Sequence, residues 1–153
     1  LLTILIQDVA SRSIWWFLPP LLFGVIVWLR FDVISWIGMA FNIGFIVLLM
    51  TLLTGYIRLR WGKLQHPFKE HFGWGDLLFI LAITPLLPFP YFVYYFTAGT
   101  FLTLIIHLIV AFFRKQATIP YAGYFSLVTL IYLILLQCGI DVFQQITHDA
   151  GLG

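Results

Sequence analysis

The sequence predicts an all-α, polytopic transmembrane helical bundle. Of the 153 residues, 62% are hydrophobic and only 9% are charged, and the mean hydropathy is +1.03. A soluble domain carries about 25% charged residues, so this chain has too little polar surface to coat a globule in water. Its apolar runs are continuous rather than alternating, which favours spanning helices over the strands of a membrane barrel. At roughly 20 residues for each span, about six helices fit into a single domain over residues 1–153.

Three apolar segments precede a polar loop at residues 58–72. Residues 1–7 are too short to cross a bilayer and follow no initiator Met, so we interpret them as the stump of a first helix that is truncated upstream. Residues 14–29 predict a second helix, and residues 34–57 predict a long third one. The loop that follows is rich in basic residues and histidines.

Three further apolar segments follow this loop. Residues 77–87 predict a fourth helix, which the prolines between residues 85 and 90 interrupt, because proline cannot donate to the helical ladder. This helix is short for a full crossing, so we expect it to tilt or to continue through a kink. Residues 91–113 predict the fifth helix and residues 121–140 the sixth. Residues 141–153 form a polar tail.

The basic residues predict how the bundle is oriented. When the loops are numbered alternately, seven of the eight Lys and Arg residues fall on one side of the membrane. Cytoplasmic loops accumulate Lys and Arg, so we predict this side to be cytoplasmic. The seven are Arg12, Arg58, Arg60, Lys63, Lys69, Arg114 and Lys115, and the eighth is Arg30. Asp8 and Asp76 both fall on the predicted cytoplasmic side.

The sequence Gly73-Trp74-Gly75-Asp76 places an acid where the basic loop meets an apolar helix. An acid at such a depth is costly unless water, a proton or a partner compensates it, and Asp8 is a candidate partner. Two adjacent carboxylates can share a proton, so that one activates water while the other protonates a leaving amine. Gly73 and Gly75 would let the backbone approach a bound peptide closely. This pattern predicts acid–base hydrolysis by Asp8 and Asp76.

Each acid taken alone also has a simpler explanation. Asp76 stands where an N-cap is favoured, and Asp8 is close in sequence to the cation of Arg12. Asp76 begins a helix, where the dipole favours an anion, whereas Asp8 ends one, where the dipole disfavours it. On this argument Asp8 would hold the shared proton at rest. What favours the catalytic interpretation is that both acids share one side of the membrane and a suitable sequence context.

The context of the two acids resembles the type IV prepilin peptidases and preflagellin peptidases, which are membrane aspartyl proteases of the Gly-x-Gly-Asp class. The resemblance extends over nearly the whole chain. In that family the first catalytic aspartate ends a helix and is followed by a basic residue and an Ile, as Asp8 is followed here by Arg12 and Ile14. The second aspartate closes the Gly-x-Gly-Asp motif, which is Asp76 in this chain.

A third landmark of the family is an Ile-Pro-aromatic turn before the last helix, and Ile119-Pro120-Tyr121 looks like it. The chain departs from the family pattern at Trp15-Trp16, at Trp74 and at Leu77-Leu78. It resembles the short form, without the cysteine-rich cytoplasmic region of the long bacterial enzymes.

The resemblance implies an endopeptidase of the inner (cytoplasmic) membrane, with its active site on the cytoplasmic side. It would remove the short leader peptide of prepilin-like proteins, which carry a basic leader before an apolar helix. Its partners would be these substrates and membrane lipids. The catalytic residues would be Asp8 and Asp76, and no metal or organic cofactor is expected. The net charge of +2 gives no indication of a nucleic-acid partner.

Two alternative functions stay open at this point. One is another Gly-x-Gly-Asp protease, of the presenilin or signal-peptide-peptidase type, although the Tyr-Asp and Pro-Ala-Leu motifs of that type are not evident. The other is a small transporter or scaffold without enzymatic activity. A transporter should show polar or broken helices at the midplane of the membrane, whereas the acids here gather at one face.

A few polar side chains lie within the predicted helices. Asn42, Thr51 and Thr54 in the third helix, and His107 in the fifth, are expected to form hydrogen bonds between helices. Cys138 is the only cysteine, so neither an internal disulfide nor a multi-cysteine zinc site is expected.

Overall fold

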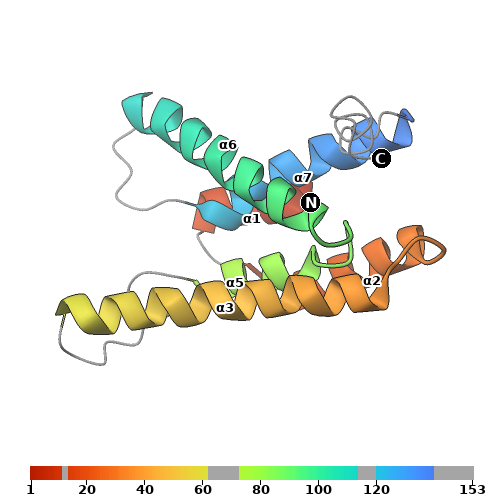
Figure 1. Ribbon diagram of the computed structural model, residues 1–153. Helices are drawn as coiled ribbons and strands as arrows, with labels where there is room; N and C mark the ends of the chain where they lie inside the picture. Colours follow the sequence, from red (N-terminus) through yellow and green to blue (C-terminus); the bar gives the residue numbers. More distant parts are fainter. Residues whose placement is uncertain (12–13, 62–72, 114–119, 140–153) are drawn as a thin grey trace, which may run out of the picture. The chain divides into compact units, whose positions relative to one another are not determined.

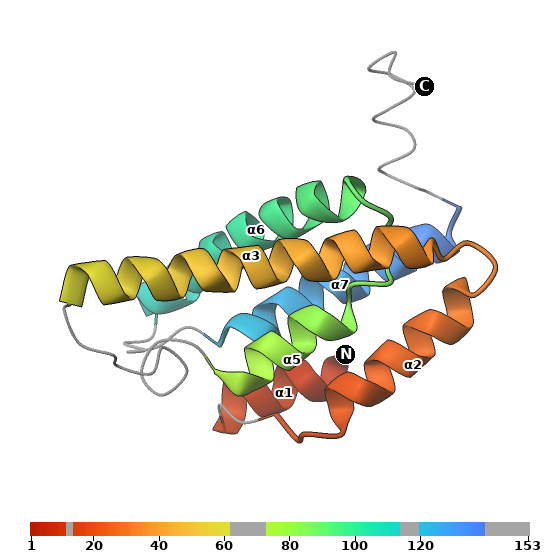
Figure 2. The ribbon, with the colours of Figure 1, turned by 60° about the horizontal axis from the view of Figure 1, so that its bottom comes forward.

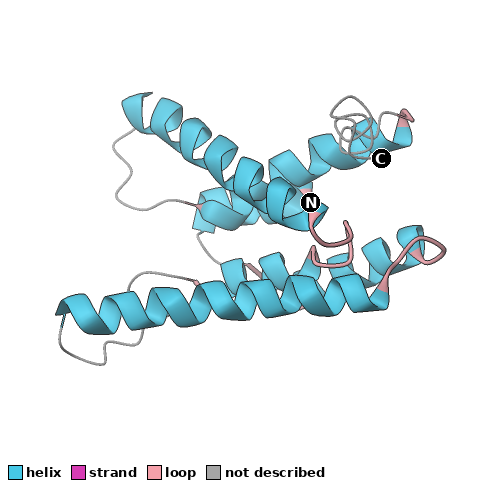
Figure 3. Cartoon of the chain, viewed as in Figure 1, coloured by secondary structure: helices cyan, strands magenta, loops and turns pink. Residues whose placement is uncertain are grey.

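The computed structural model describes residues 1–11, 14–61, 73–113 and 120–139, and in this part of the chain it contains helices and no strands (Figures 1 and 3). The all-α prediction is confirmed for these residues. The helices are α1 (Leu2–Ser11), α2 (Leu18–Arg30), α3 (Trp36–Trp61), α5 (Trp74–Ala82), α6 (Tyr91–Phe113) and α7 (Tyr121–Gln137).

Prolines account for two differences from the predicted helix boundaries. α2 begins at Leu18 rather than at residue 14, with prolines in its first turn, where the missing N–H has no intrahelical partner to lose. α5 ends at Ala82, although the apolar pattern continues to residue 87. The ring of Pro85 would clash with the carbonyl of Leu81 in a continuing helix, so the chain turns instead. α6 has the predicted boundaries.

The chain divides into two compact units, and the boundary lies within α6. The first unit comprises Leu1–Arg12 and Thr97–Gly153, and in it α1 packs against α7. The second unit comprises Ser13–Phe96, and in it α5 packs against both α2 and α3. α5 lies alongside α3 in two views of the structure (Figures 1 and 2).

The core of the first unit includes a close contact between α6 and α7. A Cβ atom at Gly99 would lie 2.6 Å from the ring of Phe125, so only glycine lets the two helices approach this closely. Phe125 is fully buried. One turn earlier on α7, the hydroxyl groups of Tyr121 and Thr100 are 3.0 Å apart and form a hydrogen bond.

In the second unit, a buried asparagine supports the segment that follows α5. Residues 83–90 are not helical, yet most of them are buried. Asn42 on α3 donates from Nδ2 to the carbonyl oxygens of Thr84 at 2.9 Å and of Leu87 at 2.7 Å. Buried backbone carbonyls need such partners once the helical ladder stops. The prediction of a contact beyond its own helix is therefore confirmed for Asn42.

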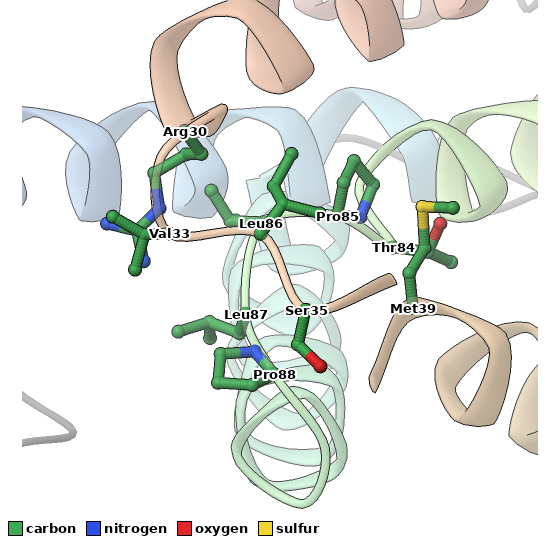
Figure 4. A pocket seen from close by; sticks show the side chains of 10 residues that line it. Arg30, Val33, Ser35, Met39, Thr84, Pro85, Leu86, Leu87 and Pro88 are labelled. Atoms are coloured by element: carbon green, nitrogen blue, oxygen red, sulfur yellow. The ribbon is translucent and has the colours of Figure 1, made fainter. Parts of the chain in front are cut away.

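A small pocket lies beside the same segment (Figure 4). Its volume is about 10 Å³, which is close to the minimum for one water molecule. Arg30, Ser35 and Thr84 contribute polar groups to its lining, and Pro85 and Pro88 contribute apolar ones. The pocket is therefore a packing defect at a proline-rich turn and is too small for an organic ligand.

Thr51 and Thr54 differ from the prediction. Thr51 donates its hydroxyl hydrogen to the carbonyl of Val47, and Thr54 donates to that of Met50, both on α3 itself. These hydroxyl groups are satisfied within their own helix, a common arrangement for threonine in helices. The predicted contacts with neighbouring helices are wrong for these two residues.

Two helices in the described part of the chain are long and apolar enough to cross a membrane, over Trp36–Arg60 and Tyr91–Phe112. Only 17% of the most apolar window in each is buried, whereas the core helix of a soluble protein is mostly buried. Leu59 and Phe112, for example, are 89% and 86% exposed. Such exposed apolar surface is uncommon on soluble monomers and suggests a membrane protein.

We expect Asn42→Leu to lower the free energy of unfolding by roughly 1–3 kcal/mol, because it leaves two buried carbonyl groups without their donor. Thermal unfolding in detergent measures the loss. Thr51→Val is the matched control on the same helix, because it removes a hydroxyl group that bonds only within α3. Equal stability of the two variants would contradict the supporting role of Asn42.

Candidate active site

Asp76 lies in the first turn of α5, and Gly73 is the N-cap of that helix. Gly73 has an extended backbone, with φ −74° and ψ 139°, and its carbonyl accepts hydrogen bonds from the N–H groups of Asp76 and Leu77. The helix therefore begins three residues earlier than the predicted span, and Asp76 is not the N-cap. Its half-buried carboxylate still lies where the helix dipole favours negative charge.

The carboxylate of Asp76 folds back over Gly73. A Cβ atom at Gly73 would lie 3.1 Å from Oδ2 of Asp76, which is closer than most real contacts of a Cβ atom. A side chain at position 73 would therefore have to displace the carboxylate. Glycine at the first position of the motif leaves the acid room at the helix end.

Gly75 leaves room for a contact with a different residue. A Cβ atom at Gly75 would lie 3.2 Å from Cδ1 of Ile14, in the segment before α2. The expected role of Gly75 was to admit a peptide, but the space beside it holds the side chain of Ile14. Ile14 is also one of the residues that carry the family resemblance. The structure thus joins the segment after the first aspartate to the Gly-x-Gly-Asp motif.

Asp8 is a buried carboxylate, with only 6% of the residue exposed, and it lies on α1. Its Oδ2 accepts a hydrogen bond of 2.6 Å from the backbone N–H of Gly123. Pro120 is the N-cap of α7, so Gly123 is the third residue of that helix. N–H groups at this position have no partner within their own helix, so Asp8 caps α7 from α1.

This contact changes the electrostatic environment of Asp8 from the one predicted for the end of α1 alone. The end of α1 disfavours an anion there, but the start of α7 favours one and supplies a charge-assisted hydrogen bond. The expectation that Asp8 holds the shared proton at rest therefore loses its basis. Gly123 was missed because nothing in the sequence links residue 8 to residue 123.

Gly123 also has no room for a side chain. A Cβ atom there would lie 3.0 Å from Oδ2 and 3.1 Å from Cβ of Asp8. The glycine therefore lets the carboxylate reach the N–H group directly. The only available signal in the sequence was a glycine just after the Ile-Pro-aromatic landmark.

The remaining predicted site residues are placed as follows. Pro120 is buried and begins α7 next to the Asp8 contact. Arg12 and Ile119 lie outside the described residues. Asp8 belongs to the first compact unit and Asp76 to the second, so their approach stays a prediction.

His107 on α6 faces an aromatic ring of α7. Its ring centroid is 6.3 Å from that of Tyr124, and both residues belong to the first unit. Among the described residues, Nδ1 of His107 has no hydrogen-bond partner. No three His, Cys, Asp or Glu side chains come together in this part of the chain as they would around a metal ion.

Comparison with models of known protein families, with curated proteins and with solved structures found no match for this chain.

We expect Gly123→Ala to destabilise the protein through Asp8, because the new methyl group would displace the carboxylate from its N–H partner. In a double-mutant cycle with Asp8→Ala, the two substitutions should couple by about 0.5–3 kcal/mol, the range for residues in contact. Thermal or denaturant unfolding in detergent gives the four stabilities.

Gly99→Ala is the matched control for this cycle. It introduces a clash with Phe125 in the same unit, which does not involve Asp8. Its effect should therefore add to that of Asp8→Ala without coupling. Coupling of the same size in both cycles would show that Asp8 acts only through general packing of the unit.

Proposed function

We propose that this chain is a membrane aspartyl endopeptidase of the prepilin peptidase type. The observation that carries the proposal is the buried carboxylate of Asp8, bound by the main chain of Gly123 at the start of α7. Burying a carboxylate is costly, and ionisable groups buried in membrane proteins typically mark functional sites. The contact links the first aspartate to the first turn of the helix that follows the Ile-Pro-aromatic landmark.

Asp76 supplies the second carboxylate of the proposed dyad. It lies at the N-terminus of α5 and is half-buried, so it has both an electrostatic environment for an anion and access for a reactant. In the proposed dyad the two carboxylates lie close together, and the repulsion between like charges makes them share one proton. The pair then titrates as a unit, and the resting proton belongs to the dyad rather than to either residue.

The proposed reaction is hydrolysis of one peptide bond. The deprotonated carboxylate takes a proton from water, and the water oxygen attacks the carbonyl carbon to give a tetrahedral intermediate. The protonated carboxyl group gives its proton to the amide nitrogen as the carbon–nitrogen bond breaks. The products are the leader, with a new carboxyl terminus, and the mature protein, with a new amino terminus. The reaction requires no cofactor.

The topology of the proposed enzyme follows from its charges and spans. We assign residues 1–153 to one membrane-embedded peptidase domain of about six helices, as the span length of roughly 20 residues allows. The seven basic residues on one side favour a cytoplasmic location for that side, and we assign the protein to the inner membrane. The substrates are prepilin-like proteins, with a basic leader and an apolar helix.

The break after α5 is the observation that would favour a transporter. Interrupted helices in transporters expose backbone carbonyl groups that coordinate ions. In this chain the carbonyl oxygens of Thr84 and Leu87 are already bound by Asn42. The break is therefore stabilised internally, which favours the peptidase. A protease of the presenilin type would use the same acids but a different substrate.

We expect Asp8→Asn and Asp76→Asn each to reduce cleavage by at least about 10²-fold, because asparagine keeps the size of the side chain but cannot exchange the proton. The double variant should be no less active than either single one, since the dyad acts as a unit. Co-expression with a prepilin-like substrate shows cleavage as a loss of leader mass. Asp32→Asn, at an exposed acid outside the dyad, is the matched control. Cleavage near the wild-type rate in either single variant would exclude that residue from catalysis.

The proposed dyad also requires Asp8 and Asp76 to approach each other. We expect cysteines at positions 8 and 76, in a Cys138→Ser background, to be joined by a short bifunctional thiol reagent in native membranes. The matched control pairs position 76 with position 2, at the other end of α1. Efficient linkage of the control pair without linkage of the 8–76 pair would contradict the dyad.

A further inference from the structure

An open groove of about 530 Å³ runs between α3 and α5, within the second compact unit. From α3 its lining includes Ile46, Met50 and Gly55, and from α5 it includes Leu77 and Leu81. The two helices lie alongside each other in Figure 2. The groove opens outward, so a molecule in the surrounding phase can enter it from the side.

The walls of this groove are apolar, although two threonines line it. Thr51 and Thr54 direct their hydroxyl hydrogens to carbonyl groups of α3 at 2.8 Å and 2.7 Å. Their donors are therefore already used. At Gly55 a Cβ atom would meet nothing within 4 Å, so the missing side chain leaves open space in the groove. The surface suits a flexible hydrocarbon chain.

One end of the groove is cationic. Arg58 lines it, is exposed and lies in the last turn of α3. From Ile46 to Arg58 the helix rises about 18 Å, at about 1.5 Å for each residue. One leaflet of a bilayer contributes about 15 Å of hydrocarbon, half of a core of about 30 Å. The groove is therefore about as long as one leaflet is deep, so a lipid with its acyl chain in the groove would have its headgroup beside Arg58.

We propose that this groove binds an anionic phospholipid, with one acyl chain against α3 and α5 and the phosphate at Arg58. The guanidinium group carries the charge opposite to that of a phosphate, and its N–H groups fit the geometry of the phosphate oxygens. A substrate with a basic leader fits this end poorly, because Arg58 would repel it. The site is independent of the proposed peptidase activity, since neither Asp8 nor Asp76 lines it.

The full chain, purified in detergent, tests the site by native mass spectrometry. The added lipids are phosphatidylglycerol and phosphatidylcholine with identical acyl chains. The wild-type protein should prefer phosphatidylglycerol, and Arg58→Gln should reduce this preference about fivefold, the factor that corresponds to about 1 kcal/mol for one basic residue near the headgroups. Arg60→Gln is the matched control, because Arg60 lies in the last turn of the same helix but does not line the groove.

A second pair of variants tests the acyl chain. Gly55→Leu fills the groove and should weaken binding of both lipids at least fivefold. Gly44→Leu is the control, because position 44 on α3 also has open space but lies outside the groove. Inorganic phosphate, added as a competitor, should not displace the lipid, since it lacks the chain that the groove holds.

The outcomes separate the possible occupants. Equal losses in Arg58→Gln and Arg60→Gln would show general surface attraction and overturn the site. Displacement by inorganic phosphate would show an anion site without a chain contact and overturn it as well. Unchanged lipid binding in Gly55→Leu would show that the acyl chain does not lie in the groove, and it would overturn the site. The groove would then be open to another occupant, such as an apolar helix. If Gly55→Leu does not fold, the two arginine variants decide the question alone.

Discussion

The hydrogen bond between Asp8 and Gly123 is the interaction on which the rest of the first unit depends. A buried carboxylate costs several kcal/mol without compensation, and the carboxylate of Asp8, a residue only 6% exposed, is compensated by an N–H group at the start of a helix. The bond requires α7 to begin beside α1 and requires a glycine at the contact. It also explains how a helix of only ten residues is held in a fixed place, since α1 could not be stable alone.

A similar constraint organises the second unit, where α5 is interrupted. Its nine residues rise about 13.5 Å, which is less than half the hydrocarbon thickness of a bilayer. In a membrane, backbone groups at its ends are therefore far from water on at least one side. Asn42 satisfies the carbonyl groups after α5, and Gly73 begins the helix in an extended conformation. The short helix can then present Asp76 in its first turn.

The sequence predicts the helices better than it predicts the contacts between them. α6 matches its predicted bounds because its apolar run lies between a proline and a basic pair. α5 ends earlier than hydropathy suggests, because hydropathy does not include the clash of Pro85 with the preceding turn. Asp76 could be located from its motif, since its setting is local. The partner of Asp8 could not, because it is 115 residues away and is a backbone group without any side-chain signature.

This difference between the two acids has a consequence for chemistry. The dipole that favours the charge of Asp76 belongs to α5, the helix that carries this residue. This electrostatic support therefore lasts as long as α5 stays folded. Asp8 receives the same kind of support from a different helix, so a small displacement of α7 along α1 would remove the N–H group and leave the carboxylate buried. Because electrostatic effects are large where water is excluded, the environment of the Asp8 carboxylate depends on how α1 packs against α7, whereas that of Asp76 depends on α5.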